Sequence, residues 1–283
     1  MRPPQPDMLL STAQVADLLG VSAATVKRWA EAGVLPSART RGGHRRFRRS
    51  ELQAFDHQQM KGGAAPVTVD EWLEQLLGPG SGLALDATLM EARGQLGSWH
   101  GVAQVLGPVL EELGARWERG AVTVLEEHVA AARLTRALAR AAEQLPVARS
   151  APRVLLATPP GEHHTLGLAL AELCFREAGR STVWAGEDVP VGDLEGWIAD
   201  HAVSVLALSA SVVSHPAALA ETVQRLAPAC TAAGASLILG GRGAWPAPPP
   251  EGSPSCEVLQ TWPELRAWLL RHGPPPARAR GPG

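Results

Sequence analysis

The chain of 283 residues has almost no net charge, few cysteines and no long apolar stretch. Its formal charge of −2 does not predict attraction to nucleic acid over the whole surface. The three cysteines show no CxxC spacing, so they indicate neither a disulfide framework nor a zinc site and favour a reducing compartment. No run of about 18 apolar residues is present, and the N-terminus lacks the pattern of a signal peptide. We therefore expect a cytoplasmic protein that does not engage a membrane.

Two breaks in composition divide the chain. The first is the flexible stretch from Lys61 to Pro66, and the second lies between Pro146 and Pro152, where a helical pattern gives way to strands. The last residues are rich in proline, glycine and arginine, which cannot build a core and predict disorder. We therefore predict three folded units, over residues 1–60, 67–148 and 151–272, and a disordered tail over residues 273–283.

The first unit has the pattern of a helix-turn-helix with a wing. Ser11 or Thr12 can cap a short helix, and Gly20 suits a tight turn. Ser22 can cap a second helix, which such a motif places in a major groove. The Gly42-Gly43 pair between two short extended runs indicates a hairpin, the wing.

A block of basic residues covers the second helix and the wing. Between Lys27 and Arg49 stand eight basic residues against the single acid Glu31. In a nearly neutral chain such a block predicts a confined surface for a polyanion, although a solvated charged face is the alternative. Helix and wing together resemble the winged DNA-binding domain of the MerR family, whose wing has a GGHR-like tip. We therefore predict that operator DNA is contacted by Lys27, Arg28, Arg39, Arg41, His44, Arg45 and Arg46.

The second helix and the wing are expected to contact different parts of the DNA. Lys27 and Arg28 can reach base edges or phosphates, whereas the wing arginines neutralise phosphate. Trp29 follows the apolar spacing of Val26 and is expected in the core.

The second unit is helical by the spacing of its apolar residues. From Val102 to Trp117 they recur three and four positions apart, as on one face of a helix. Gly120 breaks this helix, and the segment Thr123–Glu126 has the pattern of a capping box that opens the next one. With the helices expected before Gly97, a four-helix bundle is the economical arrangement.

The third unit alternates short apolar runs with helical stretches. The runs cover residues 154–157, 182–185, 203–209, 236–239 and 257–260, and the helical stretches lie near 166–178, 191–199, 217–227 and 263–270. This alternation predicts a parallel, doubly wound, Rossmann-like sheet. The whole chain is thus expected to combine α and α/β units, with any ligand of the third unit at the carboxyl ends of its strands.

The loop after the first predicted strand contains an acid two residues before a histidine. The Glu162 carboxylate can accept a hydrogen bond from one ring nitrogen of His164 and leave the other free for a metal. Gly167 would let a bulky planar ligand approach the backbone closely. Taken alone, this short pattern often occurs by chance, and such histidines are mostly surface residues.

The spacing of later residues resembles that of cobalamin-binding domains. The motif Glu162-x-His164-x-x-Gly167 resembles their DxHxxG signature, and 41 residues separate Gly167 from Ser209, at the position of their SxL element. The Gly240-Gly241 pair matches their following GG pair, and 28 residues separate it from Ser211. Two residues depart from the pattern, because Glu162 replaces an aspartate and Ser211 stands where leucine is usual.

The resemblance implies a lower-face site for cobalamin. His164 would ligate cobalt in place of the dimethylbenzimidazole arm, with Glu162 supporting it. That arm would enter a slot lined by Gly167, Ser209, Gly240 and Gly241. The longer Glu162 side chain would lengthen the support of His164, and Ser211 would loosen the slot.

Four residues of the predicted bundle form a second constellation. Taken alone, Trp117 would be a core anchor and His128 a solvated helix residue. A WxxG…EEH arrangement before a cobalamin domain, however, resembles the light-dependent MerR-type repressors called CarH. The resemblance implies that Trp117 and Glu127 contact the 5′-deoxyadenosyl group of adenosylcobalamin and that Val124 lines its space. It also implies that His128 is a possible upper cobalt ligand after light removes that group.

This family resemblance covers nearly the whole chain and implies its function. The protein would be a light-sensing, non-enzymatic regulator that represses carotenoid or other photoprotective genes. It would bind operator DNA as a dark-state homotetramer and release it on photolysis. His163 replaces an arginine that the family uses in dimer contacts, with Asp188 at the acidic partner position, so the size of the oligomer stays open. The alternatives are a corrinoid carrier for methyl transfer and a DNA-binding sensor of another cobalamin form or tetrapyrrole.

Overall fold

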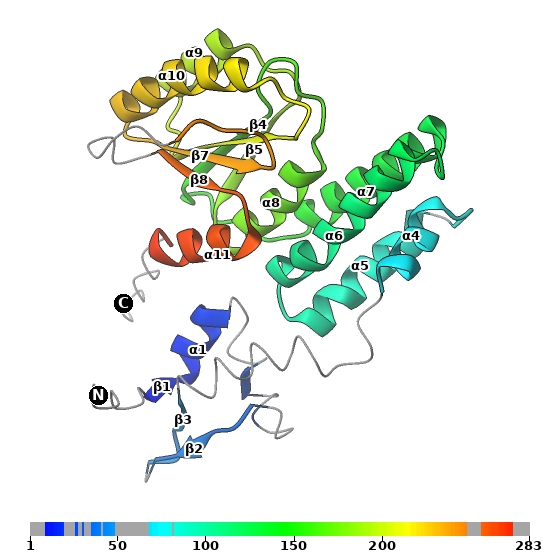
Figure 1. The fold of residues 1–283 in the computed structure, drawn as a ribbon. Coiled ribbons are helices and arrows are strands. Elements are labelled where there is room, and N and C mark those ends of the chain that lie inside the picture. Colours follow the sequence, from blue (N-terminus) through cyan, green and yellow to red (C-terminus); the bar gives the residue numbers. More distant parts are fainter. Residues whose placement is uncertain are drawn as a thin grey trace, which may run out of the picture.

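The computed structural model describes residues 9–19, 26–27, 30, 35–40, 42–48, 68–80, 82–247 and 256–273. Figure 1 shows a parallel sheet with helices on both faces, a helical bundle beside it and a small N-terminal unit. In the described ranges no helix is long and apolar enough to cross a membrane. The tail predicted to be disordered lies, beyond Gly273, outside the described residues.

The described residues of the N-terminal unit include a three-stranded antiparallel sheet and a helix. Its elements are β1 (Leu9–Ser11), α1 (Thr12–Leu19), β2 (Ala38–Arg39) and β3 (Arg45–Arg48), with strand order β1-β3-β2. The predicted wing is the β2–β3 hairpin, and Gly43 adopts the positive φ of 79° that its turn requires. Leu10, Val15, Val26, Leu35 and Phe47 bury together under the hairpin. Of the predicted second helix only Val26, Lys27 and Ala30 are described, so Trp29 lies outside the described residues.

The second unit consists of the four helices that the sequence predicts. They are α4 (Val69–Leu77), α5 (Gly82–Leu96), α6 (Trp99–Glu118) and α7 (Val124–Glu143). The capping box at the start of α7 is confirmed, since the Thr123 hydroxyl accepts from the N–H of Glu126 and the Glu126 carboxylate accepts from the N–H of Thr123. Gly120, at a φ of 73°, turns the chain between α6 and α7.

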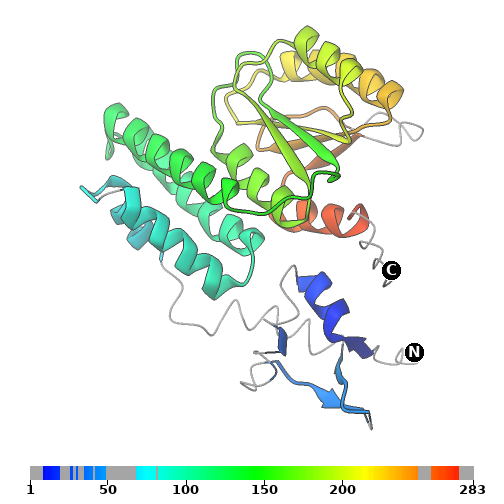
Figure 2. The same cartoon turned by 180° about the vertical axis from the view of Figure 1, so that it is seen from behind.

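The third unit is the predicted doubly wound parallel sheet. Its strands run in the order β5-β4-β6-β7-β8, and each neighbouring pair is parallel. In chain order the elements are β4 (Arg153–Ala157), α8 (Leu166–Glu177), β5 (Ser181–Gly186), α9 (Val191–Asp200), β6 (Val205–Ala210), α10 (Pro216–Ala233), β7 (Ser236–Gly241), β8 (Cys256–Leu259) and α11 (Trp262–Arg271). Both views show α9 and α10 over one face and α8 and α11 over the other (Figure 1, Figure 2).

Helix α10 is longer than its sequence pattern predicts. The prediction ended it near residue 227, before Pro228, but the helix continues to Ala233. Proline removes one helical hydrogen bond, and this loss is offset because Cys230, two residues farther on, is fully buried against the sheet. The helix ends where Gly234 adopts a left-handed conformation with φ 68°.

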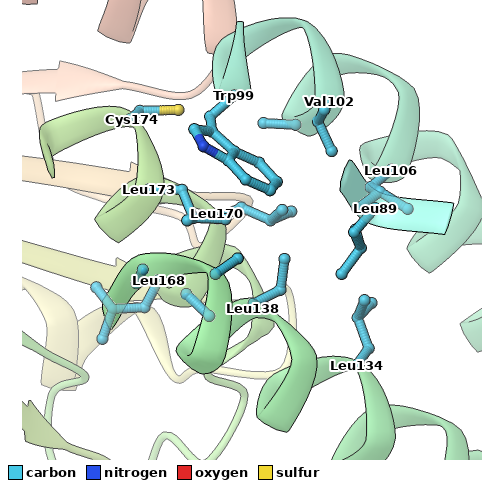
Figure 3. Close-up of a cluster of buried hydrophobic side chains, with 14 of the residues drawn as sticks. Leu89, Trp99, Val102, Leu106, Leu134, Leu138, Leu168, Leu170, Leu173 and Cys174 are labelled. Atoms are coloured by element: carbon cyan, nitrogen blue, oxygen red, sulfur yellow. The ribbon is translucent and has the colours of Figure 1, made fainter. Parts of the chain in front are cut away.

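The bundle and the sheet share one hydrophobic core. Side chains of α6 and α7 meet those of α8, with Trp99 lying over Leu170 and Leu173 and Leu138 approaching Leu168 (Figure 3). Alternate residues of β4 point into this core and into the one beneath α9 and α10. The bundle is therefore fixed on the α8 face of the sheet, with the α6–α7 turn at one end.

A buried histidine lies within this shared core. His100 of α6 is 6% exposed, and neither ring nitrogen has a hydrogen-bond partner in the described structure. Burial, with a smaller contribution from the charge of Arg266, lowers the pKa of His100 to about 4. The unfolded chain therefore takes up this proton first as the pH falls.

We expect acid to destabilise the protein through His100. Above pH 6.5 His100 is neutral in both the folded and the unfolded chain, and the protein has its full stability. As the pH falls toward 4, the unfolded chain binds the proton more readily, and the free energy of unfolding drops by about 3 kcal/mol. Urea unfolding of the wild type and of His100→Phe at pH 7 and pH 4 measures this loss. The variant should lose less stability than the wild type over the interval. Equal losses in the two proteins would show that His100 does not titrate between folded and unfolded states.

Candidate functional site

The carboxyl ends of β4 and β6 define the site. These strands are adjacent, and the chain leaves them toward opposite faces of the sheet, so they form the switch point at which doubly wound sheets bind their ligands. The loop after β4 carries Glu162 and His164, and the loop after β6 carries Ser211 and Ser214. Hydrogen bonds join the two loops to each other.

The Glu162 carboxylate is the centre of the site. It is 1% exposed, and one oxygen accepts from the N–H of His164 at 2.8 Å and from its Nδ1 at 2.6 Å. The other oxygen accepts from the N–H and the hydroxyl of Ser211, both at 2.7 Å, and from the hydroxyl of Ser214. Burial alone would raise the pKa of Glu162, but the hydrogen bonds from His164, Ser214 and Ser211 hold it well below its usual range. The group is therefore a buried, fully bonded carboxylate.

The loop that carries Glu162 is fixed to the end of β5. The Thr158 hydroxyl donates to the carbonyl of Glu162 and accepts from the N–H of Asp188. The Asp188 carboxylate accepts from the N–H of Gly161 at 2.8 Å, and its backbone has a positive φ of 51°. Within the described chain the imidazole of His163 lies 3.6 Å from Glu187 rather than beside Asp188.

One ring nitrogen of His164 forms a hydrogen bond, and the other is the candidate metal ligand. Its ring is 64% exposed, and Nδ1 is bonded to Glu162. The hydrogen bond to Glu162 raises the pKa of His164, and the charges of Glu162 and Glu127 raise it further against the effect of burial. Because Nδ1 is engaged, Nε2 is the nitrogen left for a metal. The predicted support of His164 by Glu162 is thus present as a direct 2.6 Å contact.

The predicted slot residues meet at the ends of β6 and β7. Ser209 and Gly240 are register partners, and a Cβ on Gly167 would lie 3.4 Å from the Ser209 hydroxyl. Gly241 has a φ of 79°, and a Cβ there would lie 2.2 Å from the Ala210 carbonyl oxygen. At Gly240, by comparison, an added Cβ would have its nearest neighbour at 3.6 Å, which is an ordinary contact. Glycine thus keeps side chains out of this end of the sheet.

Three hydroxyl groups complete the site, and sequence reasoning did not assign them to it. Ser211 was expected to loosen the slot, but its N–H and hydroxyl both bind Glu162 and so fix the carboxylate beneath His164. Ser214 and Thr158 were missed altogether. Small hydroxyl residues that directly follow strands of one parallel sheet indicate that the loops after these strands can contact each other. Only the strand order shows which loops do so.

The second predicted group lies where α6 ends and α7 begins. Trp117 is 48% exposed and Val124 is 56% exposed, so Trp117 is not a core anchor. The Nδ1 atom of His128 lies 2.8 Å from the carbonyl of Val124 and 3.0 Å from the Glu127 carboxylate. Since the charge of Glu127 acts on His164, this end of the bundle lies near the Glu162–His164 pair. The structure thus brings both predicted groups to one region.

The donor set suits a metal that arrives with ligands of its own. Within the described ranges no group of three or more His, Cys, Asp or Glu side chains could hold a metal ion by itself. One imidazole of fixed tautomer is enough for a metal whose equatorial positions are filled by a macrocycle. The glycine-lined end of the sheet and the exposed apolar residues of the α6–α7 turn also fit a large, partly apolar group.

Five described basic residues of the N-terminal unit line one surface. A shallow hollow is lined by Lys27, Arg39, His44, Arg45 and Arg46, together with Ser11, Thr12 and Ala13 at the start of α1. Lys27, Arg39 and His44 are exposed. Arg45 and Arg46 are half-buried, and Arg45 donates to the carbonyl of Lys27, so it also attaches the wing to the second helix. Arg28 and Arg41 lie outside the described residues.

Two family models match successive parts of this chain. A helix-turn-helix domain model matches residues 9–59, and a B12 binding domain model matches residues 68–141, which span the bundle. The chain therefore joins a DNA-binding type of domain to a cobalamin-binding type of domain, followed by the doubly wound sheet.

The curated relatives are repressors from Myxococcus xanthus. The chain is 31% identical over 137 residues to the HTH-type transcriptional repressor CarA, covering 48% of this chain and 45% of CarA. It is 36% identical over 91 residues to the HTH-type transcriptional repressor CarH, covering 32% of this chain and 30% of CarH. The chain thus matches less than half the length of either relative. These matches confirm the predicted resemblance to the CarH-type cobalamin-binding repressors.

A solved structure confirms the architecture of the second and third units. The monomethylamine corrinoid protein of Methanosarcina barkeri superposes with a TM-score of 0.55 at 15% identity. The match covers 72% of this chain and 95% of that protein. At this identity the similarity concerns the fold alone.

Proposed function

We propose that this protein is a light-responsive transcriptional repressor that binds adenosylcobalamin. The observation that carries the proposal is the Glu162–His164 pair. A buried carboxylate that accepts five hydrogen bonds holds Nδ1 of an exposed imidazole at the switch point of a doubly wound sheet. The similarity to the two Car repressors and the B12 binding domain match support the choice of ligand and of regulatory class.

The loops of the sheet would hold the lower face of the cofactor. Nε2 of His164 would bind cobalt from this side, and Glu162 would keep the imidazole ring in one tautomer and orientation. The end of the sheet near Ser209, Gly240 and Gly241 would receive the nucleotide arm, because glycine keeps that space free of side chains. These residues position the cofactor without requiring any movement of the buried carboxylate.

The α6–α7 turn would cover the upper face. When bound, adenosylcobalamin supplies a cobalt–carbon bond that light cleaves. Trp117 and Val124 offer exposed apolar surface against the deoxyadenosyl group, and the Glu127 carboxylate can accept from its hydroxyls. His128 has its Nδ1 engaged by Val124 and Glu127, so Nε2 is the nitrogen with which His128 would bind cobalt after illumination.

The output would be DNA binding through linked N-terminal units. Lys27, Arg39 and His44 are exposed on one surface and would contact operator DNA together with Arg45 and Arg46. A dark-state homotetramer would present several such units to one operator, and its dissociation would lower the effective concentration without altering any DNA contact. Carotenoid or other photoprotective genes are the targets we propose.

One experiment tests the proposal as a whole. The chain is loaded with adenosylcobalamin, kept dark or illuminated, and analysed by gel filtration and by binding to duplexes selected from a random DNA pool in the dark. We expect a cofactor-dependent oligomer that binds DNA in the dark and dissociates from it after light. Absence of cofactor binding, or binding with no light-dependent change in DNA affinity, would contradict the proposal.

A corrinoid carrier for methyl transfer is the second candidate, favoured by the fold shared with the monomethylamine corrinoid protein. In that function the N-terminal unit with its basic surface would have no role. Such a carrier would bind methylcobalamin at least as well as adenosylcobalamin, and its oligomeric state would not respond to light. The same gel filtration with both cofactors therefore separates the two functions.

We expect His128→Ala to leave the dark state unchanged and to alter the illuminated one. His128 is exposed and its removal affects no core contact, so folding and dark oligomerisation should persist. The absorption spectrum after illumination should change, because the imidazole proposed as upper ligand is gone. His201→Ala is the matched control, since His201, which directly follows α9, is another exposed histidine whose Nδ1 lies close to a carbonyl four residues earlier. A post-light spectrum identical to that of the wild type would exclude His128 as a ligand.

A further inference from the structure

The loop after β7 carries an arginine whose position suits an anion at the carboxyl edge of the sheet. Arg242 directly follows the Gly240-Gly241 pair, where β7 ends. The described parts of the loops that follow the five strands of the parallel sheet cover residues 158–165, 187–190, 211–215, 242–247 and 260–261. Among these described residues, Arg242 is the only arginine or lysine.

The charges around this edge are arranged unevenly. Glu162, Glu187 and Asp188 lie in the loops after β4 and β5, so that side of the edge is acidic. Arg242 lies at the end of β7, on the other side of β6 from these carboxylates. An anionic group that reached the edge would therefore be repelled from the β5 side and attracted to the β7 side.

The backbone beneath Arg242 is held firmly. The N–H of Gly243 donates to the carbonyl of Ala210 at the end of β6, and a Cβ on Gly243 would lie 2.7 Å from that of Ala210. The indole of Trp245 donates to the carbonyl of Gly240, and the Gln260 amide donates to that of Gly243. The loop is thus tied to the strands on both sides, and the long side chain of Arg242 is the part that can move.

The present partner of Arg242 is easily exchanged. Its guanidinium lies 3.0 Å from the carboxylate of Glu111 on α6, and the two side chains are 64% and 58% exposed. Exposed ion pairs of this kind contribute little to stability, so a better anion can replace Glu111 at small cost. A phosphodiester is such an anion, because guanidinium binds phosphate through two parallel charge-assisted hydrogen bonds.

We propose that Arg242 binds the phosphodiester of the nucleotide arm of cobalamin and exchanges Glu111 for it on binding. This inference rests on the proposed function, which places the nucleotide arm beside Ser209, Gly240 and Gly241. Arg242 is the cation next to that place, on a loop fixed to both neighbouring strands. The glycines leave space for the nucleotide arm, and Arg242 recognises the negative charge of that arm.

The test compares two corrinoids that differ in this group. Cobalamin carries the nucleotide arm with its phosphodiester, and cobinamide lacks both. Dissociation constants of the full chain for each are measured by equilibrium dialysis, for the wild type, Arg242→Gln and Glu111→Gln. Arg225→Gln is the matched control, because Arg225 also forms a partly exposed ion pair, with Glu195 on α9, away from the carboxyl edge.

We expect Arg242→Gln to weaken cobalamin binding about tenfold and to leave cobinamide binding within about twofold, as one charge-assisted contact predicts. Glu111→Gln should tighten cobalamin binding and leave cobinamide unchanged, whereas Arg225→Gln should affect neither. Equal effects of Arg242→Gln on both corrinoids, or no effect on either, would overturn the inference while the proposed function stands. Failure of the wild type to bind any corrinoid would instead overturn the proposed function itself.

Discussion

His164→Ala should reduce the affinity for adenosylcobalamin by at least about 100-fold and abolish the spectrum of histidine-ligated cobalamin. Mutation of a residue that hydrogen-bonds to a metal-binding histidine already lowers metal affinity by about 10–100-fold, and His164→Ala removes the ligand itself. The His164 ring is 64% exposed, so the chain should still fold. Equilibrium dialysis and the absorption spectrum in the dark measure the two effects.

His163→Ala is the matched control for this variant. The adjacent residue is another histidine in the same loop, its ring is 65% exposed, and its partner in the described chain is Glu187 rather than Glu162. We expect His163→Ala to retain the affinity and the spectrum of the wild type, although assembly of protomers can change. Wild-type affinity and spectrum in His164→Ala would show that the imidazole is not the lower ligand. Equal losses in both variants would show that the loop, and not the ligand, had been disturbed.

Gly241→Ala should destabilise the protein by about 2–5 kcal/mol, a large share of the 5–15 kcal/mol typical of folded domains. Two costs add. A φ of 79° disfavours any side chain by about 1–2 kcal/mol, and the new Cβ would lie 2.2 Å from the Ala210 carbonyl oxygen. That oxygen belongs to the central strand β6, which cannot yield without disturbing its ladder, and overpacking of this kind costs about 1–3 kcal/mol or more. Urea unfolding followed by circular dichroism measures the change.

Gly240→Ala is the control that separates folding from binding. The nearest atom to an added Cβ there is 3.6 Å away, an ordinary contact, so stability should fall by less than about 1 kcal/mol. Its register partner is Ser209, however, and the extra methyl would narrow the slot proposed for the nucleotide arm. We therefore expect Gly240→Ala to fold normally and bind cobalamin more weakly. If Gly241→Ala were as stable as Gly240→Ala, the strained geometry at residue 241 would be wrong.

Sequence reasoning identified the helices and strands of this protein and the Glu162–His164 pair of its candidate site. Helices and strands follow from local signals, because periodicity and caps depend on residues within a few positions of one another. The capping box at Thr123 and the five parallel strands are confirmed for this reason. The Glu162–His164 pair was also accessible, since the two residues are only two positions apart.

Only the tertiary structure decided how these pieces meet. The donors of Ser211 and Ser214 reach Glu162 across 49 and 52 positions, a contact that exists because β4 and β6 are neighbours in the sheet. The continuation of α10 past Pro228 and the exposure of Trp117 likewise depend on which faces the sheet and the bundle cover. His164 was therefore identifiable from the sequence, whereas the buried, fully bonded carboxylate that makes it a suitable metal ligand follows from packing between distant segments.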